Sequence, residues 1–243
     1  MDPRLAVIDR RLEDIARIIA VSGGKGGVGK SVTASVMALL LSKLGYRTGL
    51  LDLDFCGPSV HTILGAKPTL PEEDRGVVPP EVHGIRFMSI VHYAGENPSP
   101  IRGVDISNAT IELLAITRWG SLDFLVVDMP PGIGDATLDA IRLMKKAEFL
   151  LVTTGSKVSL AVVRRLLSML VELKVRIIGT LENMRMKDLP SAREEMEALG
   201  VPFLGEIEFD RGLEGSIGDV EKLLRTRFAE GLEKVLGKVL SSA

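Results

Sequence analysis

The chain has 243 residues, a formal net charge of -2 and 46% hydrophobic residues, and residues 1–243 are expected to form one α/β domain. The near-neutral charge and an aromatic content of 4% argue against nucleic acid as the main partner. A single cysteine excludes an internal disulfide, and the mixed-charge start is not typical of a secretory signal, so we expect a cytoplasmic protein.

Helical and strand-like patterns alternate along the chain. Helices are expected at residues 5–17, 31–45, 107–117, 136–145, 160–173 and 191–199, and in the tail from residue 219. Strands are expected at residues 17–22, 46–54, 84–91, 122–129, 147–154, 175–184 and 201–207. Residues 68–83, rich in proline and acid, interrupt this order as an excursion. The alternation predicts a doubly wound, mostly parallel β-sheet with helices on both faces, whose ligands bind at the carboxyl ends of the strands.

The segment GKGGVGKS, residues 24–31, lies between a predicted buried strand and a predicted helix. It satisfies G-x-x-x-x-G-K-[ST], in which backbone N–H groups surround a phosphate and the helix adds its positive end. We expect Lys30 to reach the β- and γ-phosphates and the Ser31 hydroxyl to ligate Mg²⁺. The predicted nucleotide-binding loop consists of Gly24, Lys25, Gly26, Gly27, Val28, Gly29, Lys30, Ser31 and Val32.

Acidic residues follow two of the predicted strands. Asp52 and Asp54 are two residues apart, so they share a face if the strand continues that far. Two carboxylates beside a phosphate-binding loop favour a Mg²⁺ site, and Asp128, after an apolar strand, is expected to join its coordination shell. Gly132 is expected to offer its N–H to the γ-phosphate and to act as a switch that senses hydrolysis.

The additional lysine, Lys25, makes the loop similar to the deviant Walker A motif, K-G-G-x-G-K-[ST], of the SIMIBI P-loop ATPases, which include MinD, ParA and Mrp. The resemblance implies a slow, switch-type ATP hydrolase that forms a homodimer on binding ATP. It implies that Lys25 points to the partner's nucleotide or to its own, and that Lys25, Lys30 and Asp54 are the catalytic residues. Asp52 then supports Mg²⁺ through water, Asp54 orients the attacking water, and Asn183 binds adenine, which favours ATP over GTP.

Longer stretches between residues 18 and 207 resemble an Mrp-type ATPase. They are LLDLDFCGPS, HGIRFMSI, IRG, LDFLVVDMPPGIGD, VTT, ENM and GVPFLGEI. Iron–sulfur carriers of that type place a C-x-x-C pair shortly after ENM, whereas the matching stretch here, ENMRMKDLPSAREEME, has no cysteine. Because thiolate ligation of a cluster needs cysteines, this departure argues against a carrier.

A closer likeness is to the ATP-dependent, archaeal HypB-like proteins of nickel hydrogenase maturation. The stretches PEEDRGVVPPEVHGIRFM and IRGVDISNATIELLAITRWGSLDF are the ones that resemble this subgroup. The resemblance implies a metal-assembly ATPase that inserts nickel, with a HypA-like metallochaperone and a hydrogenase large subunit as partners. An Mrp-type iron–sulfur assembly ATPase and a MinD/ParA-like positioning ATPase are the alternatives.

Cys56 and His61 are candidate ligands for a transition metal, Ni²⁺ or Zn²⁺, in addition to the expected ATP and Mg²⁺. Thiolate and imidazole suit such a metal, and a two-fold dimer would double the number of ligands. Alternatively, Cys56 is a small buried residue and His61 lies on a helix surface.

The two terminal helices, within residues 1–17 and 219–243, have open roles. The first could dock a partner or pack on the domain. The second is amphipathic, but its interspersed acids indicate ordinary packing, and we do not expect it to bind a membrane.

Overall fold

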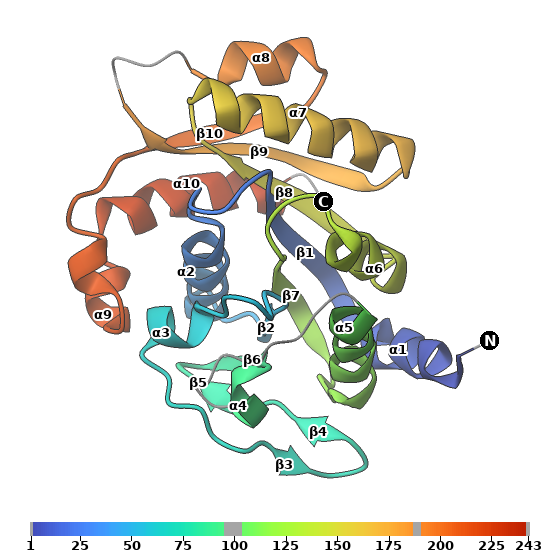
Figure 1. The fold of residues 1–243 in the computed structure, drawn as a ribbon. Coiled ribbons are helices and arrows are strands. Elements are labelled where there is room, and N and C mark those ends of the chain that lie inside the picture. Colours follow the sequence, from blue (N-terminus) through green and yellow to red (C-terminus); the bar gives the residue numbers. More distant parts are fainter. Residues whose placement is uncertain (1, 95–103, 187–190, 242–243) are drawn as a thin grey trace.

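The computed structural model describes residues 2–94, 104–186 and 191–241, which form an eight-stranded sheet in the order β10-β9-β8-β1-β7-β2-β6-β5 (Figure 1). The strands are β1 (Ile15–Gly23), β2 (Thr48–Asp52), β5 (Glu81–Val82), β6 (Ile85–Ser89), β7 (Leu122–Asp128), β8 (Ala147–Thr153), β9 (Arg176–Arg185) and β10 (Phe203–Glu208). All neighbours pair in parallel except β5 and β6. The predicted doubly wound, mostly parallel sheet is therefore confirmed.

Helices cover both faces of the sheet (Figure 1). On one face lie α1 (Pro3–Glu13), α5 (Val104–Ile116), α6 (Asp135–Leu143), α7 (Lys157–Glu172) and α8 (Arg193–Ala198). On the other lie α2 (Lys30–Lys43), α3 (Val60–Leu64), α9 (Val220–Leu223) and α10 (Arg227–Ser241). The strands alternate between the two cores: in β7, Val127 packs into the first and Val126 into the second. This two-sided burial explains the continuous apolar runs in the sequence.

Several local predictions differ from the structure. The first helix ends at Glu13 rather than residue 17, because β1 starts at Ile15. The tail forms two helices, because the helical conformation is interrupted after α9. The second helix then starts after Thr226, whose hydroxyl caps it by accepting a hydrogen bond from Ala229 N at 3.1 Å. The excursion contains the hairpin strands β3 (Glu72–Glu73) and β4 (Val77–Val78), and the short helices α3 and α4 (Val91–Ala94) were not predicted.

Both terminal helices pack on the rest of the chain. Helix α1 buries Ile8 and Leu12 in the core that it shares with α5, and Arg11 Nε donates to Ala115 O at 3.1 Å. Helix α10 buries its apolar face, Phe228 and Leu232 included, in the core around α2 and β10. The structure thus supports packing on the domain as the role of both terminal helices. No helix in the described ranges has the length and apolar character needed to cross a membrane.

Candidate functional site

The phosphate-binding loop connects β1 to α2, as predicted. Strand β1 ends at Gly23, and α2 begins at Lys30 after Gly29, whose φ is +87°. Among the described residues no side chain caps this helix, and the first amide that bonds back is Thr33 N, which donates to Gly29 O at 3.0 Å. The N–H groups of Lys30, Ser31 and Val32 are therefore available to an anion at the positive end of the helix.

The glycines of the loop divide into two kinds. A Cβ added to Gly24 would lie 2.9 Å from Val163 N in α7, and one added to Gly29 would lie 2.2 Å from Asn183 Nδ2. By contrast, a Cβ on Gly26 or Gly27 would meet nothing within 4 Å. The loop is thus held by close packing at both ends and borders open space in the middle, where a phosphate would lie.

Two predicted carboxylates lie beside Lys30 and Ser31 of this loop. Asp52 and Asp128 are register partners at the carboxyl ends of β2 and β7. Lys30 Nζ lies 2.6 Å from Asp128 Oδ1 and 3.5 Å from Ser31 Oγ, with the Lys30 side chain only 6% exposed. The Oδ2 atoms of Asp52 and Asp128 are buried without a hydrogen-bond partner in the described part of the chain. Unpaired carboxylate oxygens next to a serine hydroxyl fit Mg²⁺, which prefers oxygen ligands.

Burial shifts the protonation of both carboxylates. Desolvation first, and then the charge of Asp128, raise the pKa of Asp52 to about 8. Desolvation also raises the pKa of Asp128, while the Lys30 ammonium acts in the opposite direction. In the metal-free protein Asp52 therefore keeps its proton at neutral pH, whereas Asp128 is the carboxylate paired with Lys30.

Mg²⁺-dependent nucleotide binding is expected to tighten as the pH rises towards about 8, the raised pKa of Asp52. Mg²⁺ competes with the Asp52 proton, so its affinity should change by up to about tenfold per pH unit below that pKa. Asp52→Asn should flatten the dependence in titrations of Mg²⁺ into the ADP complex, since the phosphate titration of ADP is common to both proteins. An equally steep profile in the variant would contradict this assignment.

Because Asp52 takes up a proton on folding, the stability of the metal-free protein should fall as the pH rises from about 4 to about 8.

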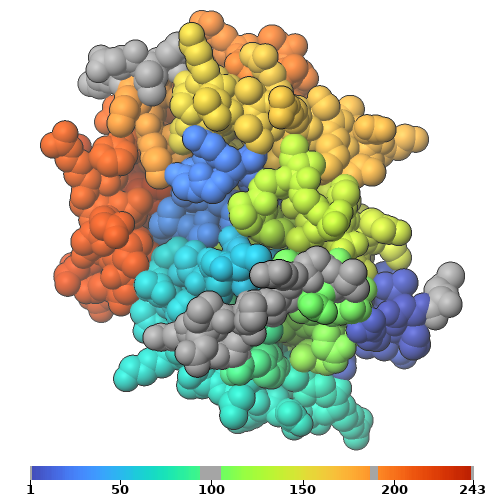
Figure 2. Space-filling view, in the orientation of Figure 1, coloured from blue at the N-terminus to red at the C-terminus, as the bar shows by residue number. Residues whose placement is uncertain are grey.

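Asp54 lies outside the strand, so the condition for sharing a face with Asp52 is not met. Strand β2 ends at Asp52, and Asp54 N donates to Asp52 Oδ1 at 3.0 Å as the chain turns. Asp54 Oδ1 accepts from Gly57 N at 3.1 Å. The turn nevertheless keeps Asp54 at the same edge of the sheet. Figure 2 shows the blue segment that contains the loop bordered by the cyan segment after β2 and the yellow-green segment after β7.

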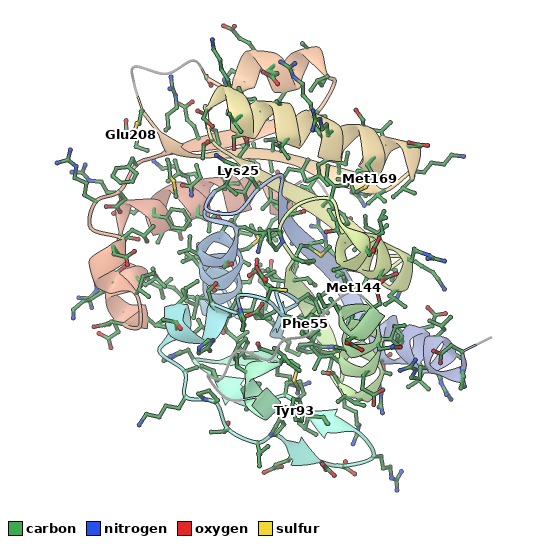
Figure 3. The ribbon with its side chains drawn as sticks, viewed as in Figure 1. Lys25, Phe55, Tyr93, Met144, Met169 and Glu208 are labelled. Carbon is green, nitrogen blue, oxygen red and sulfur yellow. The ribbon has the colours of Figure 1, made fainter. Side chains whose placement is uncertain are left out.

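The other residues predicted to bind the nucleotide lie in or near the loop. Gly132, with φ +81°, directs its N–H to Gly23 O at 3.4 Å. Asn183 is buried and donates from Nδ2 to Val28 O at 3.0 Å, so it supports the loop directly, a contact that the sequence did not reveal. Its role in adenine binding stays a prediction. Lys25 extends from the loop above α2 (Figure 3), and within the described residues its ammonium forms no ion pair.

The metal site predicted at Cys56 and His61 would draw two ligands from each of two subunits, and it stays a prediction. Cys56 is exposed, so the alternative of a small buried residue is wrong. His61 is partly exposed on α3, with Nε2 3.2 Å from Thr62 Oγ1. No group of three or more His, Cys, Asp or Glu side chains placed to hold a metal occurs in the described ranges. The IRG stretch, residues 101–103, lies outside those ranges.

Comparisons with known proteins relate this chain to proteins of iron transfer and to iron–sulfur cluster carriers. Residues 14–240 match the model of the ParA family described as NUBPL iron-transfer P-loop NTPase. An iron–sulfur cluster carrier protein of Aquifex aeolicus is 38% identical over 86% of this chain and 59% of its own length. One from Pseudomonas fragi is 39% identical over 71% of this chain and 62% of its own. The chain thus spans about 60% of the length of these curated relatives.

Solved structures share the fold. A nucleotide-binding protein from Archaeoglobus fulgidus, in complex with ADP and with cobalt found, is 30% identical, with a TM-score of 0.77 over 90% of this chain and 92% of its own. The cell division ATPase MinD of Pyrococcus furiosus is 19% identical, with a TM-score of 0.70 over 94% of this chain and 100% of its own. The latter similarity concerns the fold alone.

The interpretation as a nickel hydrogenase maturation protein is wrong. The family model and the curated relatives concern iron transfer and iron–sulfur clusters, and they give no support to Ni²⁺, a HypA-like chaperone or a hydrogenase subunit. Part of the HypB-like stretches holds structural contacts instead: Arg118 pairs with Asp74, and the Arg86 guanidinium donates to Trp119 O. The resemblance to the Mrp and MinD class is confirmed, and the chain belongs to the ParA/NUBPL family of iron-transfer P-loop NTPases.

Proposed function

We propose that this protein is a Mg²⁺-dependent ATPase whose nucleotide state switches its conformation during iron–sulfur cluster assembly. The observation that carries the ATPase proposal is the group formed by Lys30, Ser31, Asp52 and Asp128 beside an open, uncapped loop. The identity to iron–sulfur cluster carriers supports the choice of cargo.

The chemistry follows from the charges at the site. Lys30 and the first N–H groups of α2 bind the phosphate oxygens, which requires the Lys30 ammonium to leave Asp128. Ser31, Asp52 and Asp128 would hold Mg²⁺, which supplies further neutralisation of the phosphate charge. Asp54 positions a water molecule for in-line attack on the γ-phosphate. The Gly132 N–H, now directed at Gly23 O, turns to the γ-phosphate and returns after hydrolysis.

A homodimer completes this proposal. The Lys25 ammonium forms no ion pair within the described residues, and its side chain is half-buried at the edge of the loop. Both observations support a role opposite a second subunit's nucleotide or its own. There it would add positive charge as the leaving phosphate becomes more negative.

Asp54→Ala is expected to bind ATP, to hydrolyse it at least about a hundredfold more slowly and to accumulate as an ATP-held dimer. The reason is that the loop, Lys30 and the Mg²⁺ ligands stay intact while the attacking water loses its carboxylate. Phosphate release and size-exclusion chromatography with ATP measure the two effects. Adding Lys25→Ala to this variant should return it to monomer. Hydrolysis by Asp54→Ala at the wild-type rate would show that its assigned role is wrong.

The cargo is tested by cluster transfer. The assay combines purified protein with iron, sulfide and an apo-ferredoxin acceptor under anaerobic conditions, in the presence of Mg-ATP or Mg-ADP. The absorbance of the acceptor's cluster is followed over time. Faster assembly with Mg-ATP, lost in Lys30→Ala, supports the proposal, whereas equal rates with wild type, Lys30→Ala and no protein would contradict it. The chain has one cysteine, so a Cys56→Ser arm shows whether the exposed thiol contributes to transfer.

A further inference from the structure

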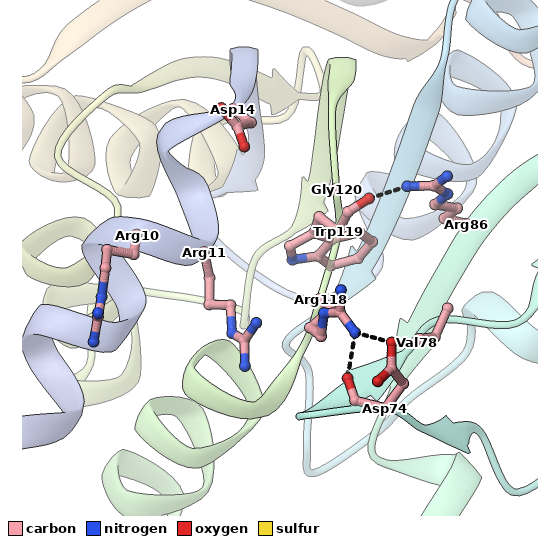
Figure 4. A pocket seen from close by; sticks show the side chains of 9 residues that line it. All are labelled: Arg10, Arg11, Asp14, Asp74, Val78, Arg86, Arg118, Trp119 and Gly120. Carbon is pink, nitrogen blue, oxygen red and sulfur yellow. Dashed lines mark hydrogen bonds and ion pairs between the residues drawn. The ribbon is translucent and has the colours of Figure 1, made fainter.

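A second pocket lies at the opposite edge of the sheet from the phosphate-binding loop. It has a volume of about 420 Å³ and is formed where α1 meets β1, where the chain enters β7, and beside β4 and β6 (Figure 4). The side chains that matter for its chemistry are Arg10, Arg11, Arg86, Arg118, Asp74 and Trp119. The loop follows the carboxyl end of β1, whereas this pocket borders Asp14 at its amino end, so the two sites are separate.

Positive charge in this pocket exceeds negative charge. Its lining contains four arginines against two carboxylates, those of Asp14 and Asp74. Of the four, Arg118 pairs with Asp74, whose side chain is 67% exposed, while Arg10 forms no ion pair in the described part of the chain. Among the residues that the structure describes, Arg11 donates to two carbonyls, Ala115 O at 3.1 Å and Arg75 O at 2.8 Å.

The arginines are close enough for their positive charges to repel one another. Burial first, and then the charges of Arg118 and Arg10, lower the pKa of Arg11. A Cβ added to Gly76 would lie 2.6 Å from Arg11 Nη2 and 3.0 Å from Arg118 Cγ, so both side chains reach the same point. An anion held between them would relieve this repulsion.

Trp119 supplies an independent reason to expect a ligand here. The side chain is fully buried, and its Nε1 has no hydrogen-bond partner among the described residues. The opposite edge of the ring packs on β2, where a Cβ at Gly49 would lie 2.9 Å from Cε3 and from Cζ3. In Figure 4 the indole nitrogen lies on the edge of the ring that faces Arg11. A buried donor without an acceptor is costly, and an anionic oxygen in the pocket would satisfy it.

We propose that this pocket binds a small organic polyanion, whose carboxylate or phosphate oxygens accept hydrogen bonds from the arginines and from Trp119 Nε1. The volume suits a molecule of metabolite size rather than a protein segment. Guanidinium groups bind both kinds of oxyanion with paired hydrogen bonds. This site is additional to the ATPase function and does not depend on it.

Trp119 is the only tryptophan, so its fluorescence reports on the pocket. Citrate and inorganic phosphate are titrated separately into metal-free protein saturated with ADP, at constant ionic strength. We expect a saturable change in emission, and affinity about tenfold lower in Arg10→Gln and in Arg118→Gln. Arg225→Gln, at an exposed arginine beside α9, is the matched control and should bind as the wild type does.

The two probes distinguish the source of the charge. Tighter binding of citrate supports a polycarboxylate ligand, and tighter binding of phosphate supports a phosphorylated one. No saturable change with either, or equal affinity in the wild type and Arg10→Gln, would overturn the proposal. Arg10→Gln decides the result if Arg118→Gln misfolds, because Arg10 is exposed and holds no ion pair within the described ranges.

Discussion

Replacing Lys30 with alanine is expected to lower ATP hydrolysis by about two to three orders of magnitude, the usual cost of losing a group that stabilises the transition-state charge. In the structure this ammonium is the cation paired with Asp128, and Asp52 and Asp54 are nearby. Without it, the triphosphate would lie beside these acidic side chains and would lose its buried positive contact. ATP affinity should therefore fall as well, by at least about tenfold.

Lys43 provides the matched control for this prediction, because it lies in the last turn of the same helix and is exposed. Lys43→Ala should bind and hydrolyse ATP as the wild type does. Equilibrium binding of a fluorescent ATP analogue and phosphate release measure the two effects, with circular dichroism to confirm folding. If Lys30→Ala retains wild-type affinity and rate, the loop is not the nucleotide site.

The arrangement of the candidate nucleotide site could be predicted from sequence because most of its parts are local. The loop, the buried strand before it and the helix after it occupy one continuous stretch, so spacing alone placed Lys30 and Ser31 together. Asp52 and Asp128 could also be predicted, since parallel strands bring their carboxyl ends to one edge of a sheet.

Other contacts depend on tertiary packing and have no signal in the sequence. Asn183 reaches Val28 O from 155 residues away, and that contact depends on the order of the strands. The pairing of Lys30 with Asp128 arises because burial raises the cost of leaving either charge alone. In the sequence Trp119 is only part of a stretch that resembles HypB-like proteins. In the structure its ring packs against Gly49, and its Nε1 has no hydrogen-bond partner among the described residues.

The error about nickel has a similar origin. The missing C-x-x-C motif is a property of four positions, whereas the relation to iron–sulfur carriers extends over 214 residues. The stretches that resemble HypB-like proteins contain Asp74 and Arg118, which in the structure form an ion pair between the excursion and the segment before β7. Residues that hold a fold together can resemble a subgroup without sharing its chemistry.

Replacing Asp128 with asparagine is expected to destabilise the nucleotide-free protein by about 3 kcal/mol, the lower end of the cost of breaking a buried ion pair. The side chains of Lys30 and Asp128 are 6% and 0% exposed, and their atoms lie 2.6 Å apart. The variant leaves a buried ammonium facing a neutral amide. Asp52 can compensate only in part, because burial, the main cause of its raised pKa, remains when the charge of Asp128 is removed.

Urea denaturation at neutral pH without nucleotide measures this effect, and Asp123→Asn is the control. Asp123 lies on the same strand but pairs with Arg47, whose side chain is 62% exposed, so its loss should cost far less stability than the loss of Asp128. In a Lys30→Ala background, Asp128→Asn should cost far less than in the wild type, because no buried ammonium is left unpaired. The single variant Asp128→Asn should also bind Mg²⁺ about 10- to 100-fold more weakly than the wild type. Loss of Mg²⁺ affinity without loss of stability would show that Asp128 serves the metal alone, and that the ion pair contributes nothing to holding the site before ATP arrives.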